Sequence, residues 1–184
     1  TFTSSNNQRF MAVDDSNNLY VAFFDNRFKA GIDNNYEIFF RRFTYNFGSP
    51  YVTRVTEMSR MSKYPAMAIR NWGDSDLDTV NDSGRVYIVW QDARLFSVPL
   101  ANEPKSYTIF MRTFRSKGGT AFGPEMQVSP YDSQNVASLP VVTVGDSSRV
   151  WIAWQKPNNG TGTTEVYYSI YNSLTASLSA VARM

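Results

Sequence analysis

One short segment occurs three times in this chain of 184 residues. Its copies span residues 18–27, 85–94 and, in a shorter form, 149–156. The residues Leu19, Val86 and Val150 occupy the same place in each copy and lie 67 and then 64 residues apart. Self-similarity at a nearly constant spacing indicates structural units that cannot bury their apolar faces alone and must stack on one another. The sequence therefore predicts a repeat protein of three similar units.

Each unit contains three further apolar segments, which are rich in Val, Ile, Tyr and Phe and separated by Gly, Asn, Asp and Pro. This composition is typical of short strands joined by turns. The repeated segment is the second strand of each unit, and no window shows a helical period. The other expected strands are 10–13, 36–41 and 51–55, then 65–69, 107–112 and 125–128, then 140–144, 165–169 and 178–181.

The second strand is apolar on both of its faces. Alternate side chains of a strand point to opposite sides, so one face carries Val86, Ile88 and Trp90 and the other carries Tyr87, Val89 and Gln91. Two buried faces favour small sheets stacked face to face, as in a β-propeller, and a β-sandwich is the alternative. We expect an all-β fold with no helix. Residues 1–184 then form one propeller-type domain with blades at about 1–60, 61–133 and 134–184.

Composition excludes several classes of function. The net charge is +2 and the 13 arginines are scattered, so no basic patch for nucleic acid is expected. No apolar stretch approaches the roughly 18 residues of a membrane-spanning helix. The chain has neither cysteine nor histidine, so it lacks disulfides, thiolate ligands and the commonest general base.

Two features predict an extracellular or cell-surface location. The sequence starts at Thr1 rather than methionine, which suggests a processed product or a piece of a longer chain. Asn81 and Asn159 stand in Asn-x-Ser/Thr triplets, the acceptor pattern for glycosylation in secreted proteins.

The second unit resembles a known family. Its Trp-Gln-Asp-Ala-Arg segment at 90–94, followed by the segment 107–124, is similar to blades of the sialidase-like propellers that carry the bacterial neuraminidase repeat, or Asp-box. Residues 116–122 resemble a degenerate Asp-box that lacks the aspartate and is one residue short. The resemblance implies a propeller fold and a glycan or protein ligand.

The catalytic residues of sialidases do not carry over. That family uses an arginine triad, an aspartate, and a tyrosine nucleophile paired with a glutamate, as an exception among glycosidases. This sequence has no Arg-Ile-Pro motif for the first arginine and no marked Tyr–Glu pair. Three blades also supply only part of a six-bladed ring. We predict no catalytic residues, and a fragment of a sialidase-like glycoside hydrolase is the alternative.

Two Asp-x-Arg pairs are the leading polar candidates, Asp25 with Arg27 and Asp92 with Arg94. In one interpretation they line a rim that binds a ligand, together with the aromatic Trp72. In the other they are structural, because a carboxylate and a guanidinium two residues apart share one strand face and form charge-assisted hydrogen bonds. Their repetition favours the structural role, since an active site seldom recurs in every unit.

An acidic loop in the second unit is a candidate metal site. Asp74, Asp76 and Asp78 alternate along it, and calcium takes oxygen ligands from such loops. Thr79 stands where an EF-hand loop requires glycine, so that motif is excluded. The competing interpretation is a solvated acidic loop, and no cofactor is otherwise required.

Three blades are too few for a closed ring, which needs roughly four to eight. The chain is then part of a larger propeller, or two copies close a ring, or neighbouring subunits cover the ends. The expected function is a non-enzymatic extracellular recognition or scaffold module. A structural subunit of a surface or viral assembly is a further alternative.

Overall fold

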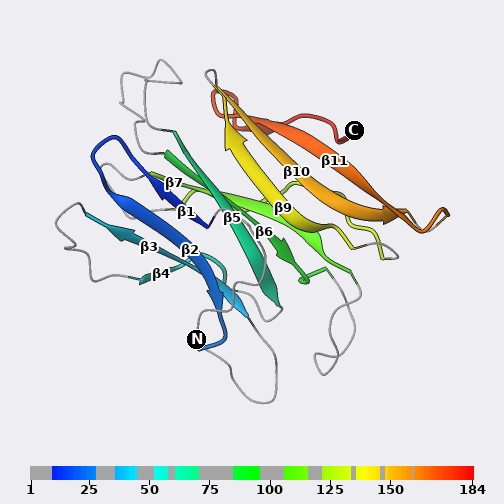
Figure 1. Ribbon diagram of the computed structural model, residues 1–184, viewed down its shortest axis with the longest axis horizontal. Coiled ribbons are helices and arrows are strands. Elements are labelled where there is room, and N and C mark those ends of the chain that lie inside the picture. The colour runs from blue at the N-terminus through cyan, green and yellow to red at the C-terminus, as the bar shows by residue number, and fades with distance from the viewer. Residues whose placement is uncertain are drawn as a thin grey trace.

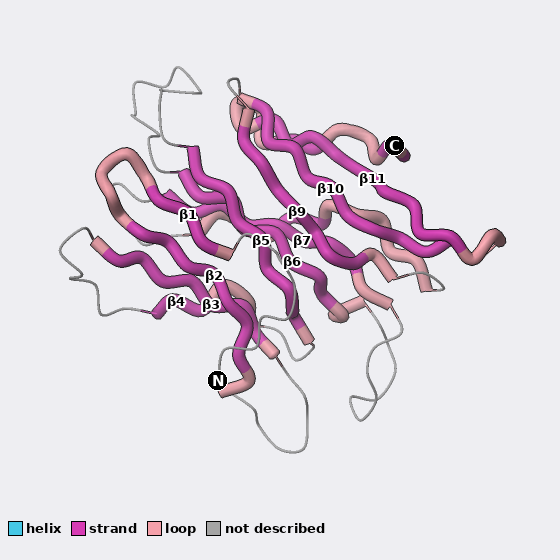
Figure 2. Tube along the Cα trace, viewed as in Figure 1, coloured by secondary structure: helices cyan, strands magenta, loops and turns pink. Residues whose placement is uncertain are grey.

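The described part of the chain contains strands and no helix (Figures 1 and 2). The computed structural model describes residues 10–27, 36–44, 52–57, 61–70, 85–95, 106–115, 122–133, 136–145, 148–158 and 160–184. Within these ranges the predicted all-β class is confirmed. No helix in them is long and apolar enough to cross a bilayer.

The strands form three antiparallel sheets, and each sheet contains one copy of the repeated segment as its second strand. The first sheet has the order β1 (Met11–Val13), β2 (Leu19–Asp25), β3 (Glu37–Phe43) and β4 (Val52–Arg54). The second has the order β5 (Ser62–Arg70), β6 (Arg85–Asp92), β7 (Thr108–Arg115) and β8 (Met126–Gln127). The third contains β9 (Ser138–Val144), β10 (Arg149–Asn158), β11 (Thr163–Asn172), β12 (Ser177–Leu178) and β13 (Ala182–Arg183).

The fourth strand of the third sheet is split. We expected it at 178–181, but β12 and β13 both pair with β11 and are separated by 179–181. Ser179 bridges the gap, because its Oγ accepts a hydrogen bond from the Ile170 backbone N–H at 2.9 Å. The second sheet has the same interruption, with an isolated bridge at Phe122 followed four residues later by the start of β8.

The sheets lie in chain order, with the second between the first and the third (Figure 1). Strand β6 is buried along its whole length because its two faces serve two cores. Val86, Ile88 and Trp90 pack with residues of the first sheet such as Tyr20 and Phe40. Tyr87 and Val89 pack instead with residues of the third sheet, including Ile152 and Trp154. The two-sided burial predicted for this strand is therefore observed.

One backbone hydrogen bond recurs where each sheet meets the next. The Ser62 N–H donates to the Tyr36 carbonyl at 2.7 Å, and the Ala137 N–H donates to the Tyr107 carbonyl at 3.1 Å. Tyr36 and Tyr107 each precede a third strand. Ser62 and Ala137 each lie three residues before the proline of a first strand. The second sheet thus meets the first, and the third meets the second, through the same backbone contact.

The first strands of the second and third sheets contain equivalent bulges. Tyr64 and Leu139 have φ angles of 52° and 51°, and each precedes a proline. The pairing of β5 with β6 shifts between Lys63 and Ala66, and a shift occurs at the same place in the pairing of β9 with β10. Both bulges lie on strands at a sheet edge, where such irregularities are common.

Candidate functional site

The Asp25–Arg27 pair lies at the end of β2 and is partly open to solvent. The Asp25 carboxylate accepts hydrogen bonds from Nη2 and from the backbone N–H of Arg27, both at 2.7 Å. The guanidinium also lies over the ring of Phe39, 4.9 Å from its centre. The hydrogen bond from Arg27 lowers the pKa of Asp25 more than partial burial raises it. The charged groups of Asp25 and Arg27 therefore bind each other.

The Asp92–Arg94 pair makes the same two internal hydrogen bonds and a third from Nε, and it has more partners outside the pair. The backbone N–H and Nε of Arg94 bind one oxygen of Asp92 at 2.8 and 2.9 Å. The other oxygen accepts from Arg94 Nη2 at 2.7 Å, from the Trp90 indole N–H at 2.9 Å and from the Ser62 hydroxyl at 3.0 Å. Both oxygens are occupied and Asp92 is 0% exposed, so the geometry supports a structural role for this carboxylate.

Arg94 connects this pair to two other parts of the sheet. Its Nη1 binds Glu125, just before β8, and its guanidinium lies 4.1 Å from the centre of the Phe110 ring. Burial alone would lower the pKa of Arg94, but the hydrogen bonds and charges of Asp92 and Glu125 raise it above its ordinary value. Arg94 is thus a permanently charged cross-link within the second sheet.

The third sheet has a lysine in the equivalent cluster. Lys156 lies over the ring of Tyr167, 5.7 Å from its centre, and Tyr167 stacks on Trp154. Lys156 also forms a 2.8 Å ion pair with Asp132, which lies in the segment that joins the second sheet to the third. A cation therefore lies over the aromatic residue of the third strand in every sheet, although the third cation comes from a different position.

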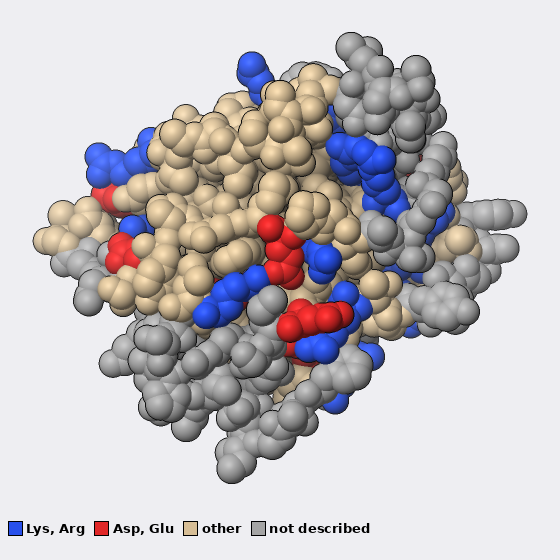
Figure 3. Space-filling view, turned by 180° about the vertical axis from the view of Figure 1, so that it is seen from behind, with Lys and Arg blue, Asp and Glu red and all other residues tan. Residues whose placement is uncertain are grey.

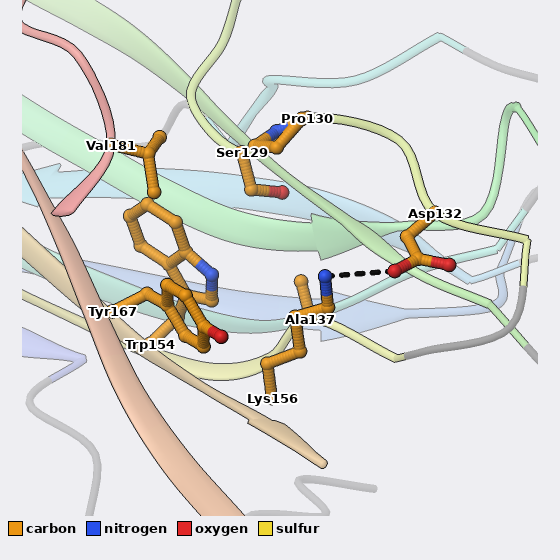
Figure 4. Close-up of a pocket in the computed structure, with 8 residues that line it drawn as sticks. All are labelled: Ser129, Pro130, Asp132, Ala137, Trp154, Lys156, Tyr167 and Val181. Atoms are coloured by element: carbon orange, nitrogen blue, oxygen red, sulfur yellow. Dashed lines mark ion pairs between the residues drawn. The ribbon is translucent and has the colours of Figure 1, made fainter. Parts of the chain in front are cut away.

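A cavity of about 50 Å³ lies beside Lys156. Figure 4 shows the Lys156–Asp132 ion pair on one side of it and the rings of Trp154 and Tyr167 on another. Its walls are formed by Ser129, Pro130, Asp132, Ala137, Trp154, Lys156, Tyr167 and Val181. Ligand pockets usually measure about 300–1,000 Å³, whereas this space suits one or two waters. It is too small to be a substrate site.

A tyrosine–glutamate contact is present that sequence analysis did not find. The Tyr167 hydroxyl donates to Glu165 at 2.7 Å, while Asn158 and Arg183 donate to the other carboxylate oxygen at 2.9 and 2.8 Å. The hydrogen bond from Tyr167, with those from Asn158 and Arg183, lowers the pKa of Glu165. The same bond raises the pKa of Tyr167, so the phenol stays protonated near neutral pH. A nucleophilic tyrosine needs a lowered pKa, or a neighbouring base that is available to accept its proton.

The first sheet has a counterpart of this cluster. Glu37 and Glu165 occupy the same place in their third strands, paired with Asp25 and Lys156 respectively. Glu37 forms an ion pair with Arg54 at 2.8 Å, as Glu165 does with Arg183 at 2.8 Å. The repeated position of the two glutamates was visible in the sequence, but their arginine partners depend on the pairing of the fourth strand.

Trp72 and the acidic residues Asp74, Asp76 and Asp78 lie outside the described residues, as do the two glycosylation triplets' asparagines and most of the degenerate Asp-box. Among the residues that are described, no three acidic side chains are grouped to hold a metal ion. In the face seen in Figure 3, acidic and basic side chains lie next to one another, as the ion pairs above require.

Comparisons with known proteins add no relative, because no family model, curated protein or solved structure matches this chain.

Proposed function

We propose that this chain is a run of three sialidase-like β-propeller blades that acts as a non-enzymatic recognition and scaffold module. It belongs outside the cell or at its surface, and it binds a glycan or a protein partner through the loops between its strands. The three stacked antiparallel sheets, two of four strands and one of five, support the blade assignment. Propellers serve many functions, so the fold alone does not decide the role of this chain.

The observation that carries this proposal is the cation placed over an aromatic ring in every sheet. Arg27 lies over Phe39, Arg94 over Phe110 and Lys156 over Tyr167, and each cation is also held by a carboxylate. This group of a cation, a carboxylate and an aromatic ring recurs in each unit, and its charges are paired with each other, so we assign it to stabilising the fold. Ligand binding is then the task of the loops, where Trp72 is the first candidate.

The chemistry of the described residues also favours binding over catalysis. Glycoside hydrolysis needs two carboxyl groups, or a tyrosine and a carboxylate, around a site that accepts a sugar ring. The Tyr167–Glu165 contact is the specific observation in favour of the hydrolase alternative. Its tyrosine is held as the neutral phenol and its glutamate is engaged by three donors.

Binding to an array of neutral and sialylated glycans tests the proposal, with hydrolysis of a fluorogenic sialoside measured in parallel. We expect retention on at least one glycan class without turnover. Binding should weaken at least tenfold in Trp72→Ala and stay unchanged in Leu174→Ala, which removes an exposed apolar side chain from the turn after β11. Turnover that disappears in Tyr167→Phe would replace this proposal with the hydrolase alternative.

A structural subunit of a surface or viral assembly is the second candidate. It is favoured by the apolar outer faces of the first and third sheets, which expose Met11, Val13, Val141 and Trp151. A blank glycan array together with large assemblies in solution would support it over the recognition role.

A further inference from the structure

The two outer sheets each leave one largely apolar face uncovered, although Arg41 and Arg54 also lie on that of the first sheet. Among the described residues, six of the eleven large hydrophobic side chains that are exposed lie on these two faces. The pairing of Met11 with Val21 and of Val13 with Leu19 places one group on a single face of the first sheet. The six residues are Met11, Val13 and Val52 on the first sheet and Val141, Trp151 and Val166 on the third.

Each sheet can be assigned a forward face and a backward face. The forward face points to the next sheet in the chain and contains Tyr20 in the first sheet and Tyr87 in the second. The backward face points to the preceding sheet and contains Ile88 in the second sheet and Ile152 in the third. Both contacts inside the chain therefore join a forward face to a backward face.

The uncovered face of the third sheet is its forward face. Trp151 stands at the repeat position of Tyr20 and Tyr87, both of which are 0% exposed, yet Trp151 is 40% exposed. Val166 likewise corresponds to the buried Ile38 and Ile109. The residues here are those that a following sheet covers elsewhere in the chain.

The uncovered face of the first sheet is its backward face. Met11 is 54% exposed, whereas its counterparts Met67 and Val142 are 1% and 7% exposed because a preceding sheet covers them. Val21 corresponds in the same way to the buried Ile88 and Ile152. The two uncovered faces are therefore of the two types, forward and backward, that pack against each other at both contacts between consecutive sheets in this chain.

We infer that a second copy of this chain covers these faces: the forward face of the third sheet docks on the backward face of the partner's first sheet. Two identical junctions of this kind close a ring of six sheets with two-fold symmetry. The inference rests on the blade arrangement in the proposed function. The recurring Ser62–Tyr36 and Ala137–Tyr107 hydrogen bonds support it, because they indicate that the relation between consecutive sheets is the same at both steps.

A second copy is favoured over unrelated partners because the chain supplies both complementary faces itself. Closed two-fold assemblies are the commonest among homo-oligomers. A ring of six sheets also falls within the range of four to eight blades that closed propellers use. An open stack, in contrast, would leave both apolar faces in water.

Light scattering coupled to size-exclusion chromatography tests the inference on the full chain and three single variants. Met11→Asp alters the backward face and Val141→Asp the forward face, at side chains 54% and 51% exposed. Leu174→Asp is the matched control, since Leu174 is 47% exposed but lies in the turn between β11 and β12. Circular dichroism shows whether each variant stays folded.

We expect the unaltered chain and Leu174→Asp to have twice the mass of the 20.9 kDa protomer. Met11→Asp and Val141→Asp should each weaken association at least a hundredfold and run at the protomer mass. Mixing these two variants should restore the double mass. In a mixed pair, one junction joins the two altered faces, and the other joins the unaltered forward face of Met11→Asp to the unaltered backward face of Val141→Asp. Trp151→Lys, on the forward face, provides a second variant if Val141→Asp does not fold.

Three results would overturn the inference. The first is a folded, unaltered chain that stays at the protomer mass up to millimolar concentration, which would mean that something other than a second copy covers these faces. The second is a dimer broken by only one of the two substitutions, which would indicate like faces pairing with each other. The third is a mass of three or more protomers. Because glycan binding is scored separately, a monomer that binds a glycan removes this inference alone, and a dimer with a blank array removes only the recognition role.

Discussion

The two Asp-x-Arg pairs have the same sequence pattern and share two internal hydrogen bonds, but their surroundings are very different. Asp92 is fully buried, and its side chain is bound by Arg94, Trp90 and Ser62. Asp25 is 21% exposed and Arg27 is 44% exposed. The difference begins with one residue: Trp90 donates its indole N–H to Asp92, whereas Phe23, at the same repeat position, has no such donor.

This comparison shows that a repeated motif can have unequal energetic weight. In the second sheet the aspartate collects several hydrogen bonds away from water, where charge-assisted bonds are strong and an unpaired charge is costly. In the first sheet the same ion pair is screened by solvent, and exposed pairs contribute little. We therefore expect the stability of the second sheet to depend on its Asp-x-Arg pair much more than the stability of the first sheet depends on its own.

The largest expected effect is that of removing the buried carboxylate. Asp92→Ala leaves the buried Trp90 N–H and Ser62 hydroxyl without this acceptor, and it leaves Glu125 as the carboxylate partner of the half-buried Arg94 guanidinium. We expect the free energy of unfolding to fall by about 3–5 kcal/mol in urea denaturation. Asp25→Ala, the matched control, should cost less than about 1 kcal/mol. Equal losses in the two variants would show that burial does not distinguish the pairs.

The second prediction concerns the shape of the cation. Arg94→Lys keeps the charge but loses the fork that binds Asp92 through Nε and Nη2 while Nη1 reaches Glu125. The unfolding free energy should fall by about 1–3 kcal/mol. Arg27→Lys, measured in the same way, should change it by less than about 0.5 kcal/mol. A larger loss at position 27 would contradict the comparison.

A third substitution makes the second copy resemble the first. Trp90→Phe removes the indole donor to Asp92 and should destabilise the protein by about 1–2 kcal/mol, because the buried carboxylate loses one charge-assisted hydrogen bond while keeping those from Arg94 and Ser62. The reciprocal Phe23→Trp should have little effect, within about 0.5 kcal/mol. Thermal and urea unfolding measure both, and a neutral Trp90→Phe would show that the indole hydrogen bond is not what separates the two pairs.

The smallest effect is the pH dependence of the exposed pair. The pKa of Asp25 in the folded protein is lowered from 3.8, first by the hydrogen bond from Arg27. Its ionised form therefore adds stability that is present above pH 3.8 and is lost as the pH falls through the folded-state pKa. The difference in unfolding free energy between the parent and Asp25→Asn should be constant near neutral pH and shrink below about pH 4. A difference that does not change with pH would remove the Asp25–Arg27 contribution.

The stacking of the sheets could be predicted from the sequence, because successive side chains of a strand point to opposite faces and neighbouring residues therefore show whether both faces are apolar. Residues 86–90 show in the sequence which side chains share a face, and the structure places them in two different cores. The Tyr167–Glu165–Arg183 cluster and the Lys156–Asp132 ion pair could not be predicted in this way. They depend on the register of β11 with β13 and on the path between sheets, which single-residue patterns do not determine.

The interruption in the fourth strand escaped prediction for a similar reason. The Ser179 backbone N–H still donates to the Ile170 carbonyl, but the Ser179 hydroxyl accepts the hydrogen bond from the Ile170 N–H, and the sequence gives no sign of this side-chain contact in advance. The role of Trp72 and of the acidic residues Asp74, Asp76 and Asp78 stays a prediction, because they lie outside the described residues.

The bulges at Tyr64–Pro65 and Leu139–Pro140 have a consequence for misassembly. Strands β5 and β9 lie at the edges of their sheets, and a regular edge strand offers its N–H and C=O groups to any extended chain that it meets. A proline beside a left-handed residue breaks that ladder and removes a donor at the same point. The chain therefore discourages edge-to-edge aggregation into fibrils, and this leaves the broad sides of its sheets as the surfaces through which it can meet other molecules in an orderly way.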